Sequence, residues 1–169
     1  FVEEFGAEYV STQVAYLMGR MLTMDIQERY TEGQIEFYRR AGMRADLLAA
    51  RQDERPFNFS DIVHPIPIGF TRIEEGDVIE MGGRSWDVRV DHGHAPDHAT
   101  FWSRDDNLVL CGDQVIASIS SNIGVYPTEP DANPLADWLD SCARLQNFAR
   151  ADHLALPGHK LPFVGMPLR

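Results

Sequence analysis

A cluster of three histidines directly after a predicted β-strand constrains this chain more than any other feature of its sequence. Along residues 86–91 apolar and charged side chains alternate, the period of two expected for a half-buried strand. The next segment, residues 92–98, reads HGHAPDH and is rich in turn-forming residues. Because loops at strand ends often carry functional groups, we expect this segment to be either a metal-binding loop or a structural one.

Two further segments repeat this combination of a strand, a glycine and a metal-binding type of residue. Asp113 follows LVLCG at residues 108–112, and His159 follows LALPG at residues 154–158. Alone, Asp113 could cap a turn and His159 could be structural. Two imidazoles and a carboxylate, each at a strand end, are together the donors that a borderline cation such as Zn²⁺ or Fe²⁺ prefers.

The rest of the pattern predicts layered α/β packing. Residues 68–116 should form an antiparallel-rich sheet, with a turn at Gly82-Gly83 and a flanking helix near 135–149 that Asn133 caps. The chain is expected to be a single, partial domain of residues 1–169, in which 68–165 carry the sheet and the ligand loops. Helices are expected within residues 1–55, at about 31–40 and 44–52 and around the helically spaced Val14, Leu17, Met18, Met21 and Leu22.

The apolar side chains of the first helix allow three interpretations. Met18, Met21, Leu22 and Met24 are expected to pack on the core. A lid over the site and a surface for a partner subunit are the alternatives.

Composition narrows the classes of partner. The formal charge of −11 repels phosphate backbones and anionic membranes, so no nucleic-acid or membrane partner is expected. No apolar run reaches membrane-spanning length, and a cytoplasmic location is expected. Cys111 and Cys142 allow one disulfide by count, but their apolar surroundings favour small buried side chains in a reducing compartment.

The order and spacing of the three segments, over about residues 70–165, resemble the metallo-β-lactamase superfamily. GHAPDH resembles the G-H-x-x-G-H motif of that family, LVLCGD its apolar strand ending in Gly-Asp, and LPGH its last histidine motif. The resemblance implies that the chain is part of a four-layer αββα sandwich. It also implies that His94 belongs to a first metal site, His159 to a second, and that Asp113 bridges the two.

The residues around these ligands are assigned more loosely. By the same resemblance His98 supports the site without binding the metal. Asp97 replaces a glycine common in the family and either orients a histidine or is an exposed turn residue, while His92 has no counterpart. Candidates for lining a substrate pocket follow the bridging aspartate: Ser120, Ser121, Asn122 and Tyr126.

The activity implied by the resemblance is that of a metal-dependent hydrolase. One or two Zn²⁺ ions, with Fe or Mn as alternatives, would activate water for attack on an ester, thioester or amide bond of a small-molecule substrate. The H-x-H-x-D-H motif of the family does not occur in these residues and is expected upstream of Phe1. No catalytic site is therefore expected to be complete in this chain, and its metal binding should be weak or absent.

Three alternatives to this activity and one possible assembly remain open. The first is an iron-dependent enzyme similar to persulfide dioxygenases, and the second is a non-catalytic binding or regulatory module on the same fold. The third is a structural domain with coincidental histidines. Finally, because missing strands would leave apolar surface uncovered, a homodimer could cover that surface.

Overall fold

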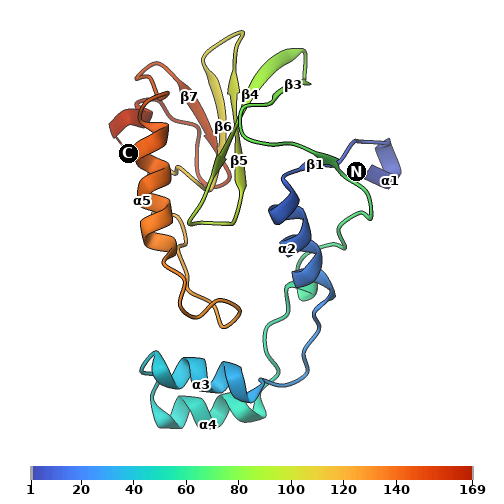
Figure 1. Ribbon diagram of the computed structural model, residues 1–169, viewed down its shortest axis with the longest axis vertical. Helices are drawn as coiled ribbons and strands as arrows, with labels where there is room; N and C mark the ends of the chain where they lie inside the picture. Colours follow the sequence, from blue (N-terminus) through green and yellow to red (C-terminus); the bar gives the residue numbers. More distant parts are fainter. Residues whose placement is uncertain (1, 169) are drawn as a thin grey trace. The chain divides into compact units, whose positions relative to one another are not determined.

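The computed structural model describes residues 2–168 and shows mixed α/β architecture (Figure 1). The chain divides into two compact units. The first contains residues up to 16, residues 69–124 and the chain from residue 133 onward, and the second contains residues 17–68 and 125–132. Helix α2, Gln13–Met24, crosses from the first unit into the second.

The first unit is built on a five-stranded sheet in the order β3-β4-β5-β6-β7. Neighbours from β3 to β6 pair antiparallel, whereas β6 and β7 pair parallel. This confirms the predicted antiparallel-rich sheet. The strands are β3 (Val78–Met81), β4 (Arg84–Asp91), β5 (His98–Ser103), β6 (Leu108–Gly112) and β7 (Leu154–Pro157).

Short elements complete the first unit. The strands β1 (Val10–Ser11) and β2 (Thr71–Arg72) form a separate parallel pair. The chain begins with the one-turn helix α1 (Val2–Phe5) and ends with a 3₁₀ turn at Met166–Leu168. Between β3 and β4, Gly82 and Gly83 have φ of +60° and +74°, which is the left-handed backbone that a two-residue hairpin turn requires.

Helix α5, Pro134–Leu145, flanks the sheet as predicted (Figure 1). The side chain of Asn133 accepts a hydrogen bond from the Ala136 amide, and Pro134 supplies the fixed φ of the first turn. Leu145 of this helix is buried, whereas Leu139 is exposed, so only part of its apolar side chains packs on the sheet. The buried core contains these residues: Trp102, Val109, Cys111, Leu145, Ala155 and Met166.

Strand β4 departs from the simple alternation of a half-buried strand. Trp86 and Val88 are buried as expected, but Asp91 on the opposite face is only 1% exposed. The guanidinium of Arg89 on that second face lies over the Phe148 ring, 4.5 Å from its centroid. The reason is α5, whose residues contact this face near the end of the strand and exclude water from it.

The prediction of buried cysteines is confirmed for Cys111, whereas Cys142 is only partly buried. Cys111 and Cys142 are both free thiols, and Cys111 is fully buried. Burial raises the pKa of Cys111 to about 12, so this thiol stays protonated and packs as a small apolar side chain.

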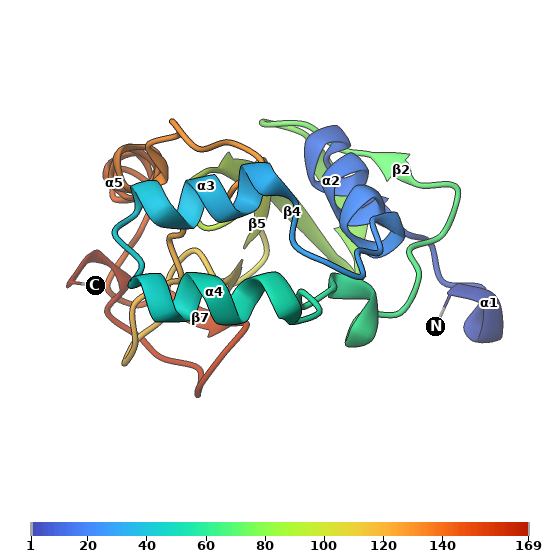
Figure 2. The ribbon, with the colours of Figure 1, turned by 90° about the horizontal axis from the view of Figure 1, so that it is seen from below.

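The second unit holds the helices α3, Glu32–Arg40, and α4, Ala45–Asp53, which lie side by side (Figure 2). Thr31 and Gln34 form a reciprocal capping box at the start of α3. Arg51 of α4 lies 4.4 Å from the centroid of the Tyr38 ring and 5.2 Å from that of Tyr30. A 3₁₀ turn at Phe59–Asp61 follows.

The expected core packing of α2 is wrong for half of the residues concerned. Met21 and Met24 are exposed, and only Met18 and Leu22 are partly buried. The helical spacing was correct, but spacing alone does not tell which elements are present to cover an apolar face. No helix in residues 2–168 has both the length and the apolar character needed to cross a membrane.

The buried strand β6 gives a prediction about stability. Replacing the fully buried Val109 by Ala removes two methyl groups and leaves a cavity, so the free energy of unfolding should fall by about 2–3 kcal/mol. The exposed Val164→Ala is the control and should change it by less than about 0.5 kcal/mol. Urea unfolding measures both, and similar effects would contradict the packing described here.

Candidate metal centre

Parallel pairing of β6 and β7 brings two of the predicted ligands to one edge of the sheet. Gly112 pairs with Pro157, and the Gly158 amide donates to the Gly112 carbonyl at 2.9 Å. The chain then continues to Asp113 on one strand and His159 on the other. His159 Nε2 lies 3.2 Å from Asp113 Oδ2.

The loop between β4 and β5 brings the third predicted ligand to the same carboxylate oxygen. His94 Nε2 lies 3.6 Å from Asp113 Oδ2. Ligand atoms on one tetrahedral zinc, with bonds of about 2.0–2.1 Å, are about 3.3 Å apart. Both imidazoles therefore approach Asp113 at the spacing of ligands that share an ion, although their role as ligands stays a prediction.

These side chains do not form a finished metal site. Within residues 2–168 no group of three or more His, Cys, Asp or Glu side chains is placed to hold a metal ion as it stands. The close approaches occur in pairs, and each pair includes Asp113. A pair is fewer than the three protein ligands that a catalytic zinc takes.

The other nitrogen of His94 is held by the main chain. His94 Nδ1 lies 3.0 Å from the carbonyl oxygen of Asn122. When Nδ1–H donates to this carbonyl, the lone pair of Nε2 is left free on the side of Asp113. Metal-binding histidines are generally oriented by such a bond. Asn122, predicted as a pocket residue, thus contacts the site through its backbone.

Two glycines of the predicted motifs allow close approaches that a side chain would block. A Cβ at Gly158 would lie 2.5 Å from Asp113 Oδ1, and one at Gly112 would lie 2.6 Å from His98 Nε2. Asp113 Oδ1 is itself buried without a hydrogen-bond partner among residues 2–168. A buried carboxylate oxygen without a donor fits a cation, so the residues present suit a metal ion.

His98 lies near His94 as a neutral group. Burial, and then the nearby His94, lower the pKa of His98 to about 4. Its ring centroid is 6.0 Å from that of His94, and no partner for its buried Nδ1 is found in the described part of the chain. These features agree with the predicted supporting role, which stays a prediction.

Asp97 is directed to a different histidine from the predicted ligands. Its Oδ1 lies 3.6 Å from Nδ1 of His92, and its φ of +48° places it in the left-handed region of a tight turn. The Thr12 hydroxyl donates to the Asp97 carbonyl at 2.7 Å. The Asp97 amide donates to the same His92 nitrogen at 3.4 Å, so Asp97 contacts His92 and not His94, and its role stays a prediction.

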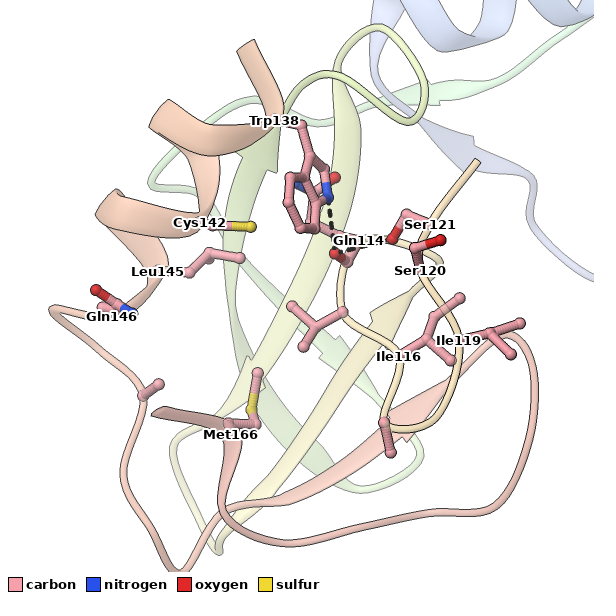
Figure 3. Close-up of a pocket in the computed structure, with 13 residues that line it drawn as sticks. Gln114, Ile116, Ile119, Ser120, Ser121, Trp138, Cys142, Leu145, Gln146 and Met166 are labelled. Carbon is pink, nitrogen blue, oxygen red and sulfur yellow. Dashed lines mark hydrogen bonds between the residues drawn. The ribbon is translucent and has the colours of Figure 1, made fainter. Parts of the chain in front are cut away.

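The predicted pocket residues fall in different places. Ser120 and Ser121 line a largely apolar cavity of about 300 Å³ between α5 and the loop after Asp113 (Figure 3). Tyr126 belongs to the second unit and is half exposed. Trp138 and Gln114 also line the cavity.

A buried hydrogen-bond chain connects the sheet to α5 just before the histidine loop. Trp102 Nε1 donates to the Thr100 hydroxyl, which donates to Asp91 Oδ2, both at 3.1 Å. Arg144 of α5 lies 3.5 Å from the other oxygen of Asp91. Burial raises the pKa of Asp91 to about 6, and the Thr100 hydrogen bond and Arg144 offset only part of this effect.

Comparison with known proteins decides the family. The sequence model of the metallo-beta-lactamase superfamily matches residues 3–159. This chain belongs to the metallo-beta-lactamase superfamily. The predicted family and α/β fold class are thereby confirmed. A search of curated protein sequences finds no match.

Solved structures of the superfamily resemble the chain over almost all of its length. A beta-lactamase domain protein from Burkholderia ambifaria is 28% identical, with a TM-score of 0.75 over 96% of this chain and 44% of that protein. A metallo-beta-lactamase family protein from Thermus thermophilus is 24% identical, with a TM-score of 0.74 over 99% and 51%. The chain thus spans about half the length of these two proteins.

A third structure, TTHA1623 in a di-iron-bound form, is more distant. It is 20% identical, with a TM-score of 0.55 over 96% of this chain and 62% of that protein. At this identity the likeness concerns the fold alone.

The close approach at Gly158 can be tested by adding one methyl group. Gly158→Ala should force Asp113 or the β7 loop to shift and lower the free energy of unfolding by about 1–3 kcal/mol. Gly69→Ala is the matched control, because no atom lies within 4 Å of the added Cβ. Denaturant unfolding measures the difference, and equal effects for the two variants would contradict the described contact.

The raised pKa of Asp91 gives a pH prediction. Folding favours the protonated form, so this group contributes stability below about pH 4 that is lost as the pH rises through about 6. His98 has the opposite effect, because its lowered pKa removes stability as the pH falls from 6.5 towards 4. In Asp91→Asn the contribution of the carboxyl group is absent, so it no longer offsets the loss of stability that His98 causes as the pH falls.

The measurement is the free energy of unfolding between pH 4 and pH 7. The free energy of unfolding of Asp91→Asn minus that of the original chain should increase from pH 4 to pH 7, by up to about 3 kcal/mol. Asp140→Asn on the exposed side of α5 is the control. If Asp91→Asn follows the pH profile of the original chain, the buried carboxyl does not titrate as described.

Proposed function

We propose that this chain contributes part of the divalent metal centre of a metal-dependent hydrolase that acts on an ester, thioester or amide bond. Members of the superfamily are generally metal-dependent hydrolases. The observation that supports the proposal is the approach of two imidazole Nε2 atoms, from His94 and His159, to the same oxygen of Asp113. Zn²⁺ fits this mixed donor set, and Fe or Mn are alternatives.

Each residue has a distinct part in this proposal. Asp113 provides the negative charge and the oxygen shared by both prospective ions. His94 binds through Nε2 because its Nδ1 is engaged by the Asn122 carbonyl. His98 stays neutral at physiological pH and adds no opposing positive charge beside the cation. When bound, the ion would supply Lewis acidity towards water and a substrate carbonyl.

The ligand count limits what these 169 residues do by themselves. With Asp113 shared, each prospective ion receives two ligands from this chain, whereas a catalytic zinc takes three from protein. We assign the missing ligands to segments of a longer protein, in keeping with structural relatives about twice the length of this chain. We therefore propose that the longer protein carries out the catalysis and that its substrate is a small molecule.

A zinc titration tests this assignment. Calorimetry at neutral pH should detect weak binding to this chain. Asp113→Ala should weaken it by more than about tenfold, because the carboxylate serves both imidazoles. The control is His64→Ala, which removes an exposed histidine of the second unit. A version extended to include an H-x-H-x-D-H motif should bind zinc far more tightly.

Two results would oppose the proposal. The first is equal zinc affinity for Asp113→Ala and the original chain. The second is zinc affinity of this chain as high as that of the extended version, since the ligands named here would then not limit binding.

A further inference from the structure

The side chain of Gln114 joins the two loops that carry the candidate ligands. It follows Asp113 directly in the chain and is fully buried. Its Nε2 donates to the carbonyl of His92 at 3.3 Å. One amide group therefore links the residue after Asp113 to a residue two positions before His94.

The backbone of Gln114 is fixed as well. Its carbonyl accepts a hydrogen bond from Trp138 Nε1 at 3.3 Å, shown as a dashed line in Figure 3. The Ser121 hydroxyl approaches the same carbonyl at 3.4 Å and donates to the Asp113 carbonyl at 2.5 Å. The loop after β6 is thus closed on itself and attached to α5.

Helix α5 also holds the histidine loop. Ser141, nearly one turn after Trp138, accepts a hydrogen bond from the His92 amide at 2.9 Å. Gly93, with φ of +103°, lies against this helix so closely that an added Cβ would be 2.3 Å from Trp138 Cβ. Both ligand loops are therefore attached to α5, and Gln114 connects them directly to each other.

Stability alone does not account for an amide at this position. Gln114 Oε1 is buried without a hydrogen-bond partner in the part of the chain that the structure describes. An unpaired buried acceptor opposes folding, and an apolar side chain of similar length would avoid that cost. The amide is best explained by what its Nε2 holds in place.

We propose that Gln114 is a positioning residue that holds the Asp113 loop and the His94 loop in register. This inference rests on the proposed metal centre, because it assigns Gln114 the task of presetting the approach of His94 to Asp113. Metal–ligand distances tolerate deviations of only about 0.2 Å, so a small relative shift of the two loops impairs binding.

Hydrogen exchange without metal tests the positioning directly. In Gln114→Met the side chain keeps its length but loses the donor to His92. The His92 and Gln114 amides, which donate to Ser141 and Cys111, should exchange at least about tenfold faster than in the original chain. The Val88 amide, bonded to Asp77, should be unchanged. Gln146→Met, at the exposed residue that caps the C-terminus of α5, is the matched control.

Thermal unfolding separates positioning from a merely structural role. Because the Oε1 acceptor is unpaired, Gln114→Met should unfold at the same temperature as the original chain or higher. Faster exchange of Val88 together with the loops, or a lower unfolding temperature, would overturn the inference. Trp138→Phe removes the indole donor to Gln114 and provides a second variant, which should also speed exchange of the Gln114 amide.

Zinc titration of the same variants links the positioning to the metal centre. Gln114→Met should bind zinc about tenfold more weakly, while Gln146→Met should bind as the original chain does. Unchanged exchange and unchanged affinity would overturn the inference. If the original chain binds no zinc, the proposed function fails, and faster loop exchange in Gln114→Met still supports the role of Gln114 as the link between the loops.

Discussion

Parallel pairing of β6 with β7 is the interaction on which the candidate centre depends. Two parallel neighbours end at the same edge of a sheet, so the residues that follow them are delivered side by side. Here those residues are Asp113 and His159. The register shifts between Leu110 and Gly112, and the hydrogen bond from Gly158 to Gly112 holds the two strand ends together beyond this irregularity. A separation of these strands would remove His159 from Asp113 even if each loop kept its own conformation.

Helix α5 gives the second constraint, because it holds the loops after the strands. It covers the sheet face that carries Trp102 and contacts the chain at Asp91, His92 and Gln114. The cost of this burial is visible in Asp91, whose pKa rises to about 6 because its charge is desolvated.

Local features of the fold could be predicted from the sequence. The alternation of apolar and charged residues predicted β4, Gly82-Gly83 predicted the hairpin turn, and Asn133 with Pro134 predicted the start of α5. Each of these depends on residues close in sequence. The candidate ligands could also be identified from the sequence, because a histidine or aspartate that follows a predicted strand is recognised without knowing which strands pair.

Features that depend on distant contacts could not be predicted. No local signal shows that β7 lies beside β6, so the approach of His159 to Asp113 required the resemblance to a known family. The burial of Asp91 follows from α5, which lies far along the chain, and contradicted the simple alternation. A role for Gln114 could not be predicted, because an isolated glutamine in a loop is usually exposed.

The most direct test of the proposed centre is a crystal structure of the chain soaked in zinc, with anomalous diffraction recorded at the zinc edge. The account predicts an anomalous peak within about 2.0–2.2 Å of Asp113 Oδ2 and of Nε2 of His94 or His159. Well-ordered Asp113, His94 and His159 side chains without a peak between them, or a zinc ion bound only elsewhere, would contradict it.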